Sequence, residues 1–297
     1  MFRNSPAPWT AADIPDQSGR TVVVTGANRG LGLETARALV DAGARVVLAV
    51  RDTAKGDAVA GELGGAATVR RLDLADLTSV REFAAGVEGP IDVLVNNAGL
   101  MAVPQSRTAD GFETQLGVNF LGHFALTGLL ADRITDRVVT LSSVMHRIGR
   151  IDLDDLNFRR RRYERWTAYG QSKLACLMFA YELEHRFVAA GSRLRSTAAH
   201  PGYSATNLQS RTESVQDAVM GVLNRIVAQP AAAGALPTLF AATVTDLPGG
   251  AYIGPDGIGE ARGHPRPVGS TAASHDRRVQ AALWERAEEL TKGAFPV

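Results

Sequence analysis

Short apolar runs alternate along the chain with longer stretches in which apolar residues recur at helical spacing. Continuous apolar runs are typical of strands buried on both faces, whereas a period of about 3.6 residues is typical of helices that cover a core. The repeated order of strand and helix predicts a parallel sheet with helices on both of its faces. The predicted strands span Thr21–Thr25, Arg45–Val50, Ala67–Leu72, Val93–Asn96, Arg137–Leu141, Leu194–Ala199 and Ala251–Ile253, and the clearest predicted helices span Leu31–Ala42, Gly111–Leu130, Ala168–Ala190 and Asp276–Leu290.

This pattern predicts an α/β fold, namely a single Rossmann-like, doubly wound domain with a mostly parallel seven-stranded sheet. The chain has 297 residues, of which 45% are hydrophobic, so it can build one large core without a second domain. Residues 1–18 are rich in proline and polar residues, and we expect them to form an N-terminal arm outside the core. The domain would then span residues 19–297.

Charge and cysteine content exclude several classes of protein. The net charge is +1 without a long basic block, so the sequence shows no electrostatic footprint for nucleic acid. Cys176 is the only cysteine, which excludes an intrachain disulfide and favours a reducing, cytoplasmic location. We expect no secretory leader and no membrane span, because no apolar run is long enough to cross a bilayer. The six histidines lack the spacing of metal ligands, so no metal is expected.

The stretch VVVTGANRGLG, from Val22 to Gly32, lies where the first predicted strand meets the first predicted helix. A glycine-rich turn at this place lets backbone N–H groups and a helix N-terminus approach a pyrophosphate. We expect Gly26 to allow a sharp turn, Gly30 to allow close approach of the anion, and Gly32 to allow the helix to pack closely on the strand. The spacing is G-x-x-x-G-x-G rather than G-x-G-x-x-G, so the position after the first strand is what favours a dinucleotide site.

The second predicted strand does not end in the acid that NAD-binding folds use to hold the ribose 2'-hydroxyl. It ends instead with Val50 and Arg51, and Arg29 lies within the glycine turn. Two planar guanidinium groups suit the anionic oxygens of a 2'-phosphate, so the sequence favours NADP(H) over NAD(H). Two alternatives stay open: the arginines are ordinary solvated side chains, or Asp52 supplies the acid for NAD.

The segment AYGQSKLA places Tyr169 and Lys173 four residues apart on a predicted helix, and hence on one face. A phenol titrates near a pH of about 10, and a neighbouring ammonium favours its phenolate form. Only three of the 32 basic residues are lysines, so a lysine at this place is notable. A lone Tyr-x-x-x-Lys pair is more often a surface pair, and it becomes specific only together with other motifs.

Six motifs occur in order along the chain: the glycine turn, NNAG, VNFLGHF, LSSVMH, AYGQSK and HPGYSAT. In this order and at these spacings they strongly resemble the short-chain dehydrogenase/reductase family, over about residues 19–290. The segments VVLAVRD, NNAGLM, SSVMHRIGRIDLDDLN and AYGQSKLACLMF are most similar to the branch that contains retinol dehydrogenases, the WW-domain oxidoreductase and light-dependent protochlorophyllide reductase. The resemblance implies hydride transfer between a nicotinamide cofactor and a carbonyl or alcohol carbon.

The resemblance also implies catalytic roles for four side chains. Tyr169 would be the general acid in carbonyl reduction and the base in alcohol oxidation. Lys173 would bind the nicotinamide ribose and lower the pKa of the tyrosine. Ser143 would hydrogen-bond the substrate oxygen, Asn119 would hold a water of the proton relay, and Ser142 would be structural.

Cofactor contacts follow from the same resemblance. Asp73 would contact the adenine, and the turn after the fourth strand would line the cofactor channel. Pro201, Gly202 and Thr206 would border the nicotinamide. The full expected set is Gly26, Asn28, Arg29, Gly30, Leu31, Gly32, Arg51, Asp73, Leu74, Asn97, Ala98, Gly99, Tyr169, Lys173, Pro201, Gly202 and Thr206.

Two further segments bear on substrate and assembly. The resemblance places a substrate-covering segment at about residues 204–230, and its apolar helical stripe favours a lipophilic substrate, although such a stripe is also typical of plain core packing. The four arginines of Arg159–Arg162 would suit an acidic substrate or a membrane surface, but such runs are more often solvated. In the family the helices that carry Asn119 and Tyr169 commonly pair across subunits, which implies a homodimer or homotetramer.

Together these features predict an NADP(H)-dependent oxidoreductase that acts on a carbonyl or alcohol carbon of a lipophilic small molecule. One alternative is reduction of an activated C=C bond by the same site. The other is a non-catalytic NADP(H) sensor or scaffold. The intact set of Asn119, Ser143, Tyr169 and Lys173 argues against a sensor, which needs only the glycine turn.

Overall fold

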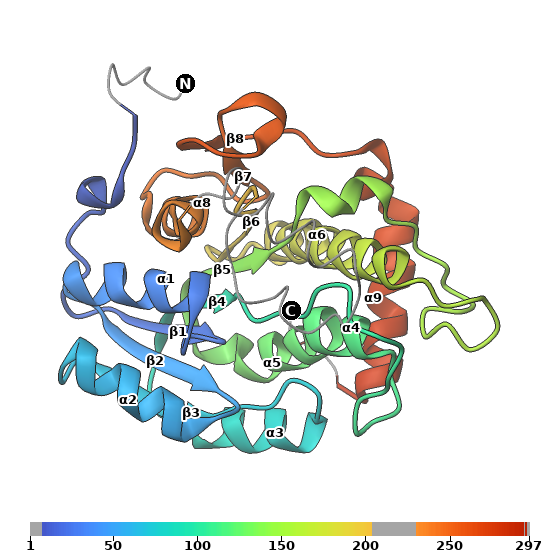
Figure 1. The fold of residues 1–297 in the computed structure, drawn as a ribbon, viewed down its shortest axis with the longest axis horizontal. Helices are drawn as coiled ribbons and strands as arrows, with labels where there is room; N and C mark the ends of the chain where they lie inside the picture. Colours follow the sequence, from blue (N-terminus) through green and yellow to red (C-terminus); the bar gives the residue numbers. More distant parts are fainter. Residues whose placement is uncertain (1–7, 204–229, 294, 296–297) are drawn as a thin grey trace, which may run out of the picture.

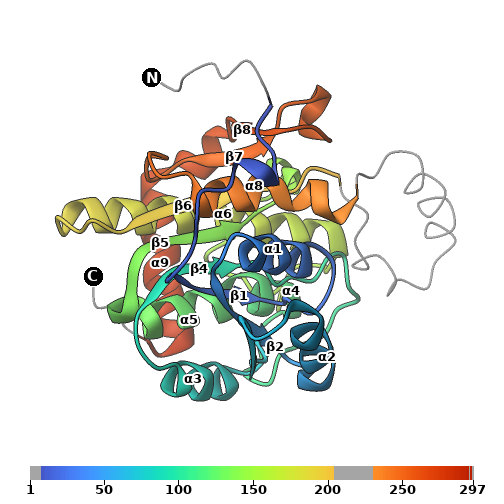
Figure 2. The same ribbon diagram turned by 90° about the vertical axis from the view of Figure 1, so that its left-hand side faces the viewer.

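The computed structural model describes residues 8–203, 230–293 and 295. The strands in this part of the chain are β1 (Thr21–Thr25), β2 (Arg45–Val50), β3 (Ala67–Arg71), β4 (Ile91–Asn96), β5 (Ile134–Leu141), β6 (Arg195–Ala199), β7 (Tyr252–Pro255) and β8 (Pro265–Pro267). They form one sheet in the order β3-β2-β1-β4-β5-β6-β7-β8, with helices on both sides (Figures 1 and 2). All pairs are parallel except β7 with β8 at the edge.

The predicted α/β fold with a doubly wound, mostly parallel sheet is confirmed, with one strand more than the seven expected. The additional strand, β8, reads Pro-Arg-Pro. Proline lacks the N–H group that a ladder needs, so this edge strand gives no strand signal in the sequence. The bounds of the other strands agree with the prediction to within three residues.

Two helical layers cover the sheet. The described helices are α1 (Gly30–Asp41), α2 (Thr53–Leu63), α3 (Leu77–Gly86), α4 (Thr114–Leu116), α5 (Gly122–Leu130), α6 (Arg165–Ala189), α8 (Ala231–Thr243) and α9 (Arg277–Thr291), and the shorter 3-10 segments are η1 (Ala11–Asp13), η3 (Ala131–Arg133), η4 (Val144–Ile148), η6 (Ile258–Glu260) and η7 (Ala272–His275). One apolar layer packs α1, α2 and α8 on the sheet, and the other packs α3, α5, α6 and α9 on the opposite face (Figure 1). None of the described helices is both long and apolar enough to span a membrane.

One predicted helix, Gly111–Leu130, is interrupted in the structure. It starts only after Glu113, whose carboxylate accepts the first free N–H groups of α4. It then passes through a π-helical turn, η2 (Gly117–Leu121), before α5 begins. The π-helical turn carries Asn119, and such turns are frequent at functional sites.

The described part of the N-terminal arm lies on the domain surface and packs against it. Trp9 meets Phe240 of α8 edge to face, with ring centroids 5.2 Å apart, and Ile14 joins the same apolar layer. Gln17 is buried. Isolated apolar residues in a proline-rich stretch have no periodicity, so the sequence could not show that they reach α8.

The C-terminal helix α9 covers part of the outer surface of α5 and α6. Trp284 of α9 stacks on Phe179 of α6, with ring centroids 5.8 Å apart, and meets Phe124 of α5 at 5.0 Å. Phe295 adds a further ring 4.5 Å from Trp284. These are the helices that the family resemblance pairs across subunits, and here the chain's own C-terminal segment occupies part of their surface.

Candidate active site

The glycine-rich turn joins the end of β1 to the N-terminus of α1. Gly26 and Gly30 have φ angles of 68° and 56°, in the left-handed region that favours glycine. A Cβ atom at Gly32 would lie 2.5 Å from both the Gly26 carbonyl oxygen and the Asn97 side-chain amide, so α1 could not pack this closely with any other residue. The turn therefore presents the positive end of α1 as a cradle for an anion. The same turn contains Asn28, Arg29 and Leu31.

Two exposed arginines flank this cradle, Arg29 on the turn and Arg51 directly after β2. Among the described residues neither guanidinium has a hydrogen-bond or ion-pair partner. Asp52 is engaged instead: its carboxylate caps α2 by accepting the Lys55 N–H at 3.2 Å, and it lies 2.7 Å from the Lys55 ammonium. These contacts with Lys55 hold the pKa of Asp52 below its ordinary value. Two cations are thus available for an anion here, while the neighbouring acid is already used.

The hydroxyl of Thr25 links β1 to the NNAG turn after β4. Its Oγ1 accepts the backbone N–H groups of Asn97 and Ala98, both at 2.9 Å, which leaves its own hydrogen for His123 Nε2 at 2.8 Å. The Nδ1 atom of His123 then donates to the Asn119 carbonyl oxygen at 2.9 Å. His123 is fully buried on α5, and burial lowers its pKa to about 4. A neutral ring of fixed orientation therefore joins the NNAG turn to the π-helical turn.

Asn119 is buried, and its side-chain amide is bonded on both ends. Oδ1 accepts the Leu100 N–H at 2.7 Å, while Nδ2 donates to the Leu100 carbonyl and to Ser172 Oγ, both at 2.9 Å. Gly99 fits closely beside this amide, because a Cβ atom there would lie 3.3 Å from Oδ1 and 3.5 Å from Lys173 Nζ. Asn119 therefore holds the NNAG turn against α6, next to Lys173.

The two serines after β5 have different surroundings. Ser142 is buried, and its Oγ donates to the Lys173 carbonyl at 2.8 Å, which fits the structural role expected of it. Ser143 is half-buried and begins η4 by accepting the Met145 N–H at 3.2 Å. Its hydroxyl hydrogen has no acceptor among the described residues, so it can be donated to a ligand.

Two glycines bring the Ser143 turn against α6. A Cβ atom at Gly149 would lie 2.4 Å from the Gly170 carbonyl oxygen, and one at Gly170 would lie 3.1 Å from the Met145 carbonyl oxygen. The two segments therefore pack backbone to backbone. This packing places the turn that carries Ser143 beside the part of α6 that carries Tyr169.

Tyr169 and Lys173 lie one turn apart on α6, and both are buried. Lys173 Nζ donates to the Leu141 carbonyl at 3.0 Å and lies 5.9 Å from the centroid of the Tyr169 ring. The Tyr169 ring meets Trp166 edge to face, with centroids 6.4 Å apart. The structure thus gathers the four predicted catalytic residues around the carboxyl ends of β4 and β5.

The remaining expected cofactor residues follow β3 and β6. Asp73 is half-buried after β3, and the carbonyl of Leu74 packs closely on α5. Pro201 and Gly202 follow β6, and Gly202 has a φ angle of 64°. Thr206, with most of the expected substrate-covering segment, lies outside the described residues.

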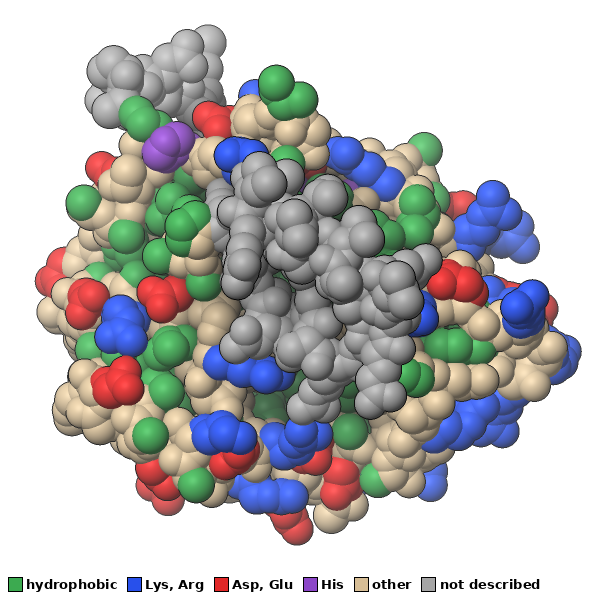
Figure 3. Space-filling model, in the orientation of Figure 1, with side chains coloured by type: hydrophobic (Ala, Val, Ile, Leu, Met, Phe, Trp, Pro, Cys, Tyr) green, Lys and Arg blue, Asp and Glu red, His purple; other side chains and the backbone are tan. Residues whose placement is uncertain are grey.

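The arginine run folds around one carboxylate. The backbone N–H groups of residues 159, 160 and 161 donate to Asp155 at 2.7, 3.1 and 2.9 Å. Burial would raise the pKa of Asp155, but these donors, led by that of Arg161, outweigh it and lower the pKa. The Arg161 guanidinium lies 4.0 Å from the centroid of the Phe158 ring. The exposed members of the run are Arg159, Arg160 and Arg162. Figure 3 shows basic side chains gathered along one edge of the face that it draws.

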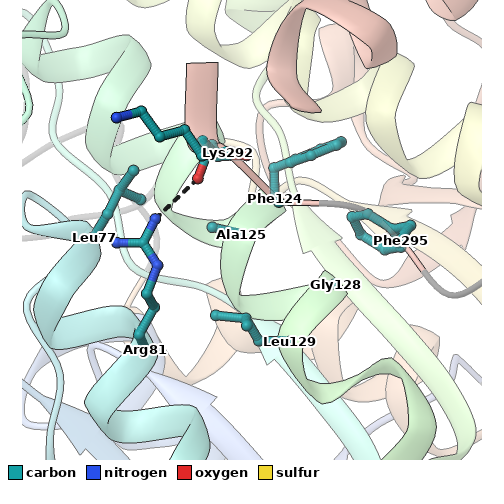
Figure 4. Close-up of a pocket in the computed structure, with 10 residues that line it drawn as sticks. Leu77, Arg81, Phe124, Ala125, Gly128, Leu129, Lys292 and Phe295 are labelled. Atoms are coloured by element: carbon teal, nitrogen blue, oxygen red, sulfur yellow. Dashed lines mark hydrogen bonds between the residues drawn. The ribbon is translucent and has the colours of Figure 1, made fainter. Parts of the chain in front are cut away.

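A cavity of about 250 Å³ lies away from these residues, between α3, α5 and the segment after α9 (Figure 4). Phe124, Leu129 and Phe295 line it with apolar surface, and at its edge Arg81 donates to the Thr291 carbonyl at 3.1 Å. None of the predicted site residues lines this cavity. It is therefore separate from the predicted active site.

Sequence reasoning missed Thr25 and His123 as parts of the site. Two signals were available, because Thr25 directly precedes the glycine turn and His123 stands four residues after Asn119, at helical spacing. The hydrogen bond between them spans 98 positions of the chain and could not be read from local pattern.

Comparisons with known proteins identify the family and the fold. A sequence profile of the family described as "short chain dehydrogenase" matches residues 20–217. Retinol dehydrogenase 13 from Homo sapiens is 38% identical over 297 residues, covering 94% of this chain and 86% of its own. Polyprenol dehydrogenase from Danio rerio is 36% identical over 292 residues, covering 92% and 87%. The crystal structure of an uncharacterised protein from Mycobacterium paratuberculosis is 53% identical with a TM-score of 0.86, covering 98% of this chain and 100% of that chain.

Proposed function

The chain belongs to the short-chain dehydrogenase/reductase family, on the retinol dehydrogenase branch, and from this premise we propose that it is an NADP(H)-dependent oxidoreductase for a lipophilic carbonyl compound or alcohol. Membership makes it an oxidoreductase that uses a nicotinamide cofactor and acts on alcohol or carbonyl groups. One observation carries the choice of NADP(H): Arg29 and Arg51 beside the cradle have no hydrogen-bond or ion-pair partner in the part of the chain that the structure describes, whereas Lys55 already engages Asp52.

The described residues fit this cofactor. The left-handed glycines and the N-terminus of α1 form a cradle for the pyrophosphate, and Arg29 and Arg51 would hold the 2'-phosphate. The Lys173 ammonium would reach the nicotinamide ribose. When bound, the nicotinamide supplies or accepts the hydride.

Protein side chains would move the proton. Tyr169 would give a proton to the carbonyl oxygen during reduction and take it back during oxidation, with the Lys173 ammonium 5.9 Å from the centroid of its ring. The free hydroxyl hydrogen of Ser143 would hold the substrate oxygen. The relay water assigned to Asn119 stays a prediction, since the Asn119 side chain is itself bonded within the protein.

Two observations support a lipophilic substrate. The relatives are named for retinol and polyprenol, which are long, apolar alcohols. Apolar side chains also surround the proposed chemistry, because half-buried Val144 and Met145 follow Ser143 and the Trp166 ring lies against Tyr169.

The cofactor choice is tested by equilibrium titration with NADPH and NADH at fixed salt. We expect NADPH to bind at least about tenfold more tightly, equivalent to about 1.4 kcal/mol. Replacing both Arg29 and Arg51 by alanine should remove this preference. The matched control is Arg278→Ala with Arg286→Ala on α9, which makes the same change in charge away from the cradle. Equal affinities in the wild type, or an unchanged preference after loss of Arg29 and Arg51, would refute the NADP(H) assignment.

Turnover is tested with NADPH and a series of aldehydes that share one head group and differ in chain length, with all-trans-retinal included. We expect kcat/KM to rise with apolar length. Tight NADPH binding without oxidation of NADPH by any aldehyde or ketone would instead favour the sensor alternative.

Self-association and a cytoplasmic location also stay predictions. Because α9 covers part of α5 and α6, a homodimer would have to use the surface of these helices that α9 leaves exposed, which includes Leu129 and Val188. Sedimentation velocity across a range of protein concentrations measures this directly.

A further inference from the structure

Three segments that carry or border the proposed site meet at one carboxylate, Glu260. Arg147 lies on η4, directly after the Ser143 turn, and donates to Glu260 Oε1 at 2.8 Å. His200 begins the turn after β6, and its Nε2 lies 3.0 Å from Glu260 Oε2. The contact with His200, followed by that with Arg147, holds the pKa of Glu260 below its ordinary value against the effect of burial. A charged carboxylate therefore binds the two turns together.

The His200 ring is fully buried, and its orientation is fixed. Nδ1 accepts the Gly202 N–H at 3.2 Å, so Nε2 is the ring nitrogen that faces Glu260. A Cβ atom at Gly254 of β7 would lie 2.1 Å from Nε2, so the ring fills space that only a glycine leaves free. Tyr252 of β7 packs on the ring, with centroids 5.2 Å apart.

The segment that carries Glu260 is also tied to the turn after β6. The Ala261 carbonyl oxygen accepts the Tyr203 N–H at 2.7 Å, and a Cβ atom at Gly202 would lie 2.5 Å from the same oxygen. Glu260 has a φ angle of 58°, in a region that is uncommon for residues other than glycine. Such a conformation persists where the surrounding structure over-determines it and often marks a functional contact. Here it lets one side chain reach both turns.

We propose that Glu260 is a positioning residue for the reaction. Through Arg147 it holds the turn whose serine would bind the substrate oxygen. Through His200 it holds the turn whose glycine would border the nicotinamide. This inference rests on the proposed function, because it assigns those two turns to substrate and cofactor.

Positioning matters here because the hydride would move between the nicotinamide, on the His200 side of this contact, and the substrate carbon, on the Arg147 side. Reacting atoms must lie about 3–3.5 Å apart, and a misplacement of about 1 Å can lower the rate by about 100-fold. Glu260 does not itself touch the reacting atoms in this arrangement. Its loss should therefore change how the two turns sit relative to each other rather than remove a reacting group.

The test uses three variants: Glu260→Gln, Arg147→Met and the double variant that combines them. The control is Glu289→Gln, which breaks only the exposed Arg286–Glu289 pair on α9. Glu260→Gln removes the negative charge that lies 2.8 Å from the Arg147 guanidinium and 3.0 Å from His200 Nε2, so the ties to both turns are weakened. We expect kcat to fall at least about tenfold and the Kd for NADPH to rise several-fold. Arg147→Met should lower kcat alone, and the double variant should be no slower than Glu260→Gln.

Glu260→Asp provides the rescue, since it keeps the charge on a side chain one carbon shorter and should recover part of kcat. Thermal unfolding of each variant gives the folded fraction, to which kcat is normalised. A kcat and NADPH affinity of Glu260→Gln equal to those of Glu289→Gln would overturn the proposal. The proposal would also be overturned if the kcat losses of Glu260→Gln and Arg147→Met multiplied fully in the double variant, because the two residues would then act independently and not through their contact. A wild-type protein without turnover would refute the proposed function. The NADPH titration would still test whether Glu260 holds the turn after β6 through His200.

Discussion

Replacing Thr25 by valine should destabilise the protein far more than one lost hydroxyl usually does. Valine keeps the shape and the β-branch but removes the atom that accepts two N–H groups and donates to His123. Two polar groups then lose their partner together, the Ala98 N–H group and the Nε2 atom of His123, whereas the Asn97 N–H group keeps the Val95 carbonyl at 2.9 Å. The Nε2 atom of His123 is the more costly of the two, because this ring is fully buried.

The expected magnitude follows from the burial of each group. A buried polar group without a partner costs about 1–3 kcal/mol. Ala98 is half-buried, so water can replace part of what its N–H group loses. We therefore expect a loss of about 2–4 kcal/mol in the free energy of unfolding, at the upper part of what single substitutions cost.

Thr35→Val is the matched control. Thr35 is also a fully buried threonine, but its hydroxyl has no hydrogen-bond partner among the described residues. A methyl group there removes an unpaired polar atom, so the free energy of unfolding should stay the same or rise by up to about 1 kcal/mol.

Urea unfolding followed by tryptophan fluorescence measures both variants, and NADPH titration reads the effect on the cradle. Thr25→Val should weaken NADPH binding, because the NNAG turn loses its tie to β1, whereas Thr35→Val should leave it unchanged. Equal stabilities for the two variants would show that the link from Thr25 to His123 contributes nothing, and the reasoning from the hydrogen bonds would be wrong.

Three further predictions concern pH, chemistry and packing. Burial lowers the pKa of His123 to about 4, below its ordinary value of 6.5, so the unfolded chain binds more protons between these values. Stability should therefore fall by about 3 kcal/mol as the pH drops from about 6.5 to 4, and a His123→Gln variant should lose this part of the pH dependence in urea unfolding. Tyr169→Phe should lower kcat by about 10²–10⁴-fold and leave NADPH binding intact. The control Tyr163→Phe loses a hydrogen bond to the Val103 carbonyl, so it should lower the melting temperature and leave turnover per folded molecule unchanged. Normal turnover in Tyr169→Phe would refute its assignment as the general acid. Trp284→Ala should lower the free energy of unfolding, measured in urea, by about 3–5 kcal/mol, because the ring packs between Phe179 and the Arg186 guanidinium, which lies 4.2 Å from the ring centroid. A loss below about 1 kcal/mol would mean that α9 contributes little to the core.

The fold could be predicted where residues act locally. Continuous apolar runs predicted the parallel strands, because both faces of these strands are buried. Apolar residues at helical spacing predicted α1, α6 and α9. The hydrophobic pattern failed where contacts between segments far apart in the chain determine the structure. Trp9 packs on Phe240 without any periodic signal, and the π-helical turn at Asn119 has the same apolar spacing as an uninterrupted helix.

The candidate site divides in the same way. The glycine turn, Asn119, Ser143, Tyr169 and Lys173 stand in motifs, so their identity could be predicted from the sequence. Their spacing in three dimensions depends on other residues. Gly149 and Gly170 set how closely the Ser143 turn approaches α6, and neither stands out in the sequence among 30 glycines.

Two polar links between distant segments explain why a motif alone does not define the geometry of this site. Thr25 reaches His123 across 98 positions of the chain, and Arg147 reaches Glu260 across 113. Both links end on turns that would hold cofactor or substrate, and neither link uses a residue that the motifs place in contact with them. A chain could therefore keep all four predicted catalytic residues and lose the spacing between its reacting groups through a single substitution at Thr25 or Glu260. In this protein, then, the motifs supply the reacting groups, and these polar links set the distances at which those groups can react.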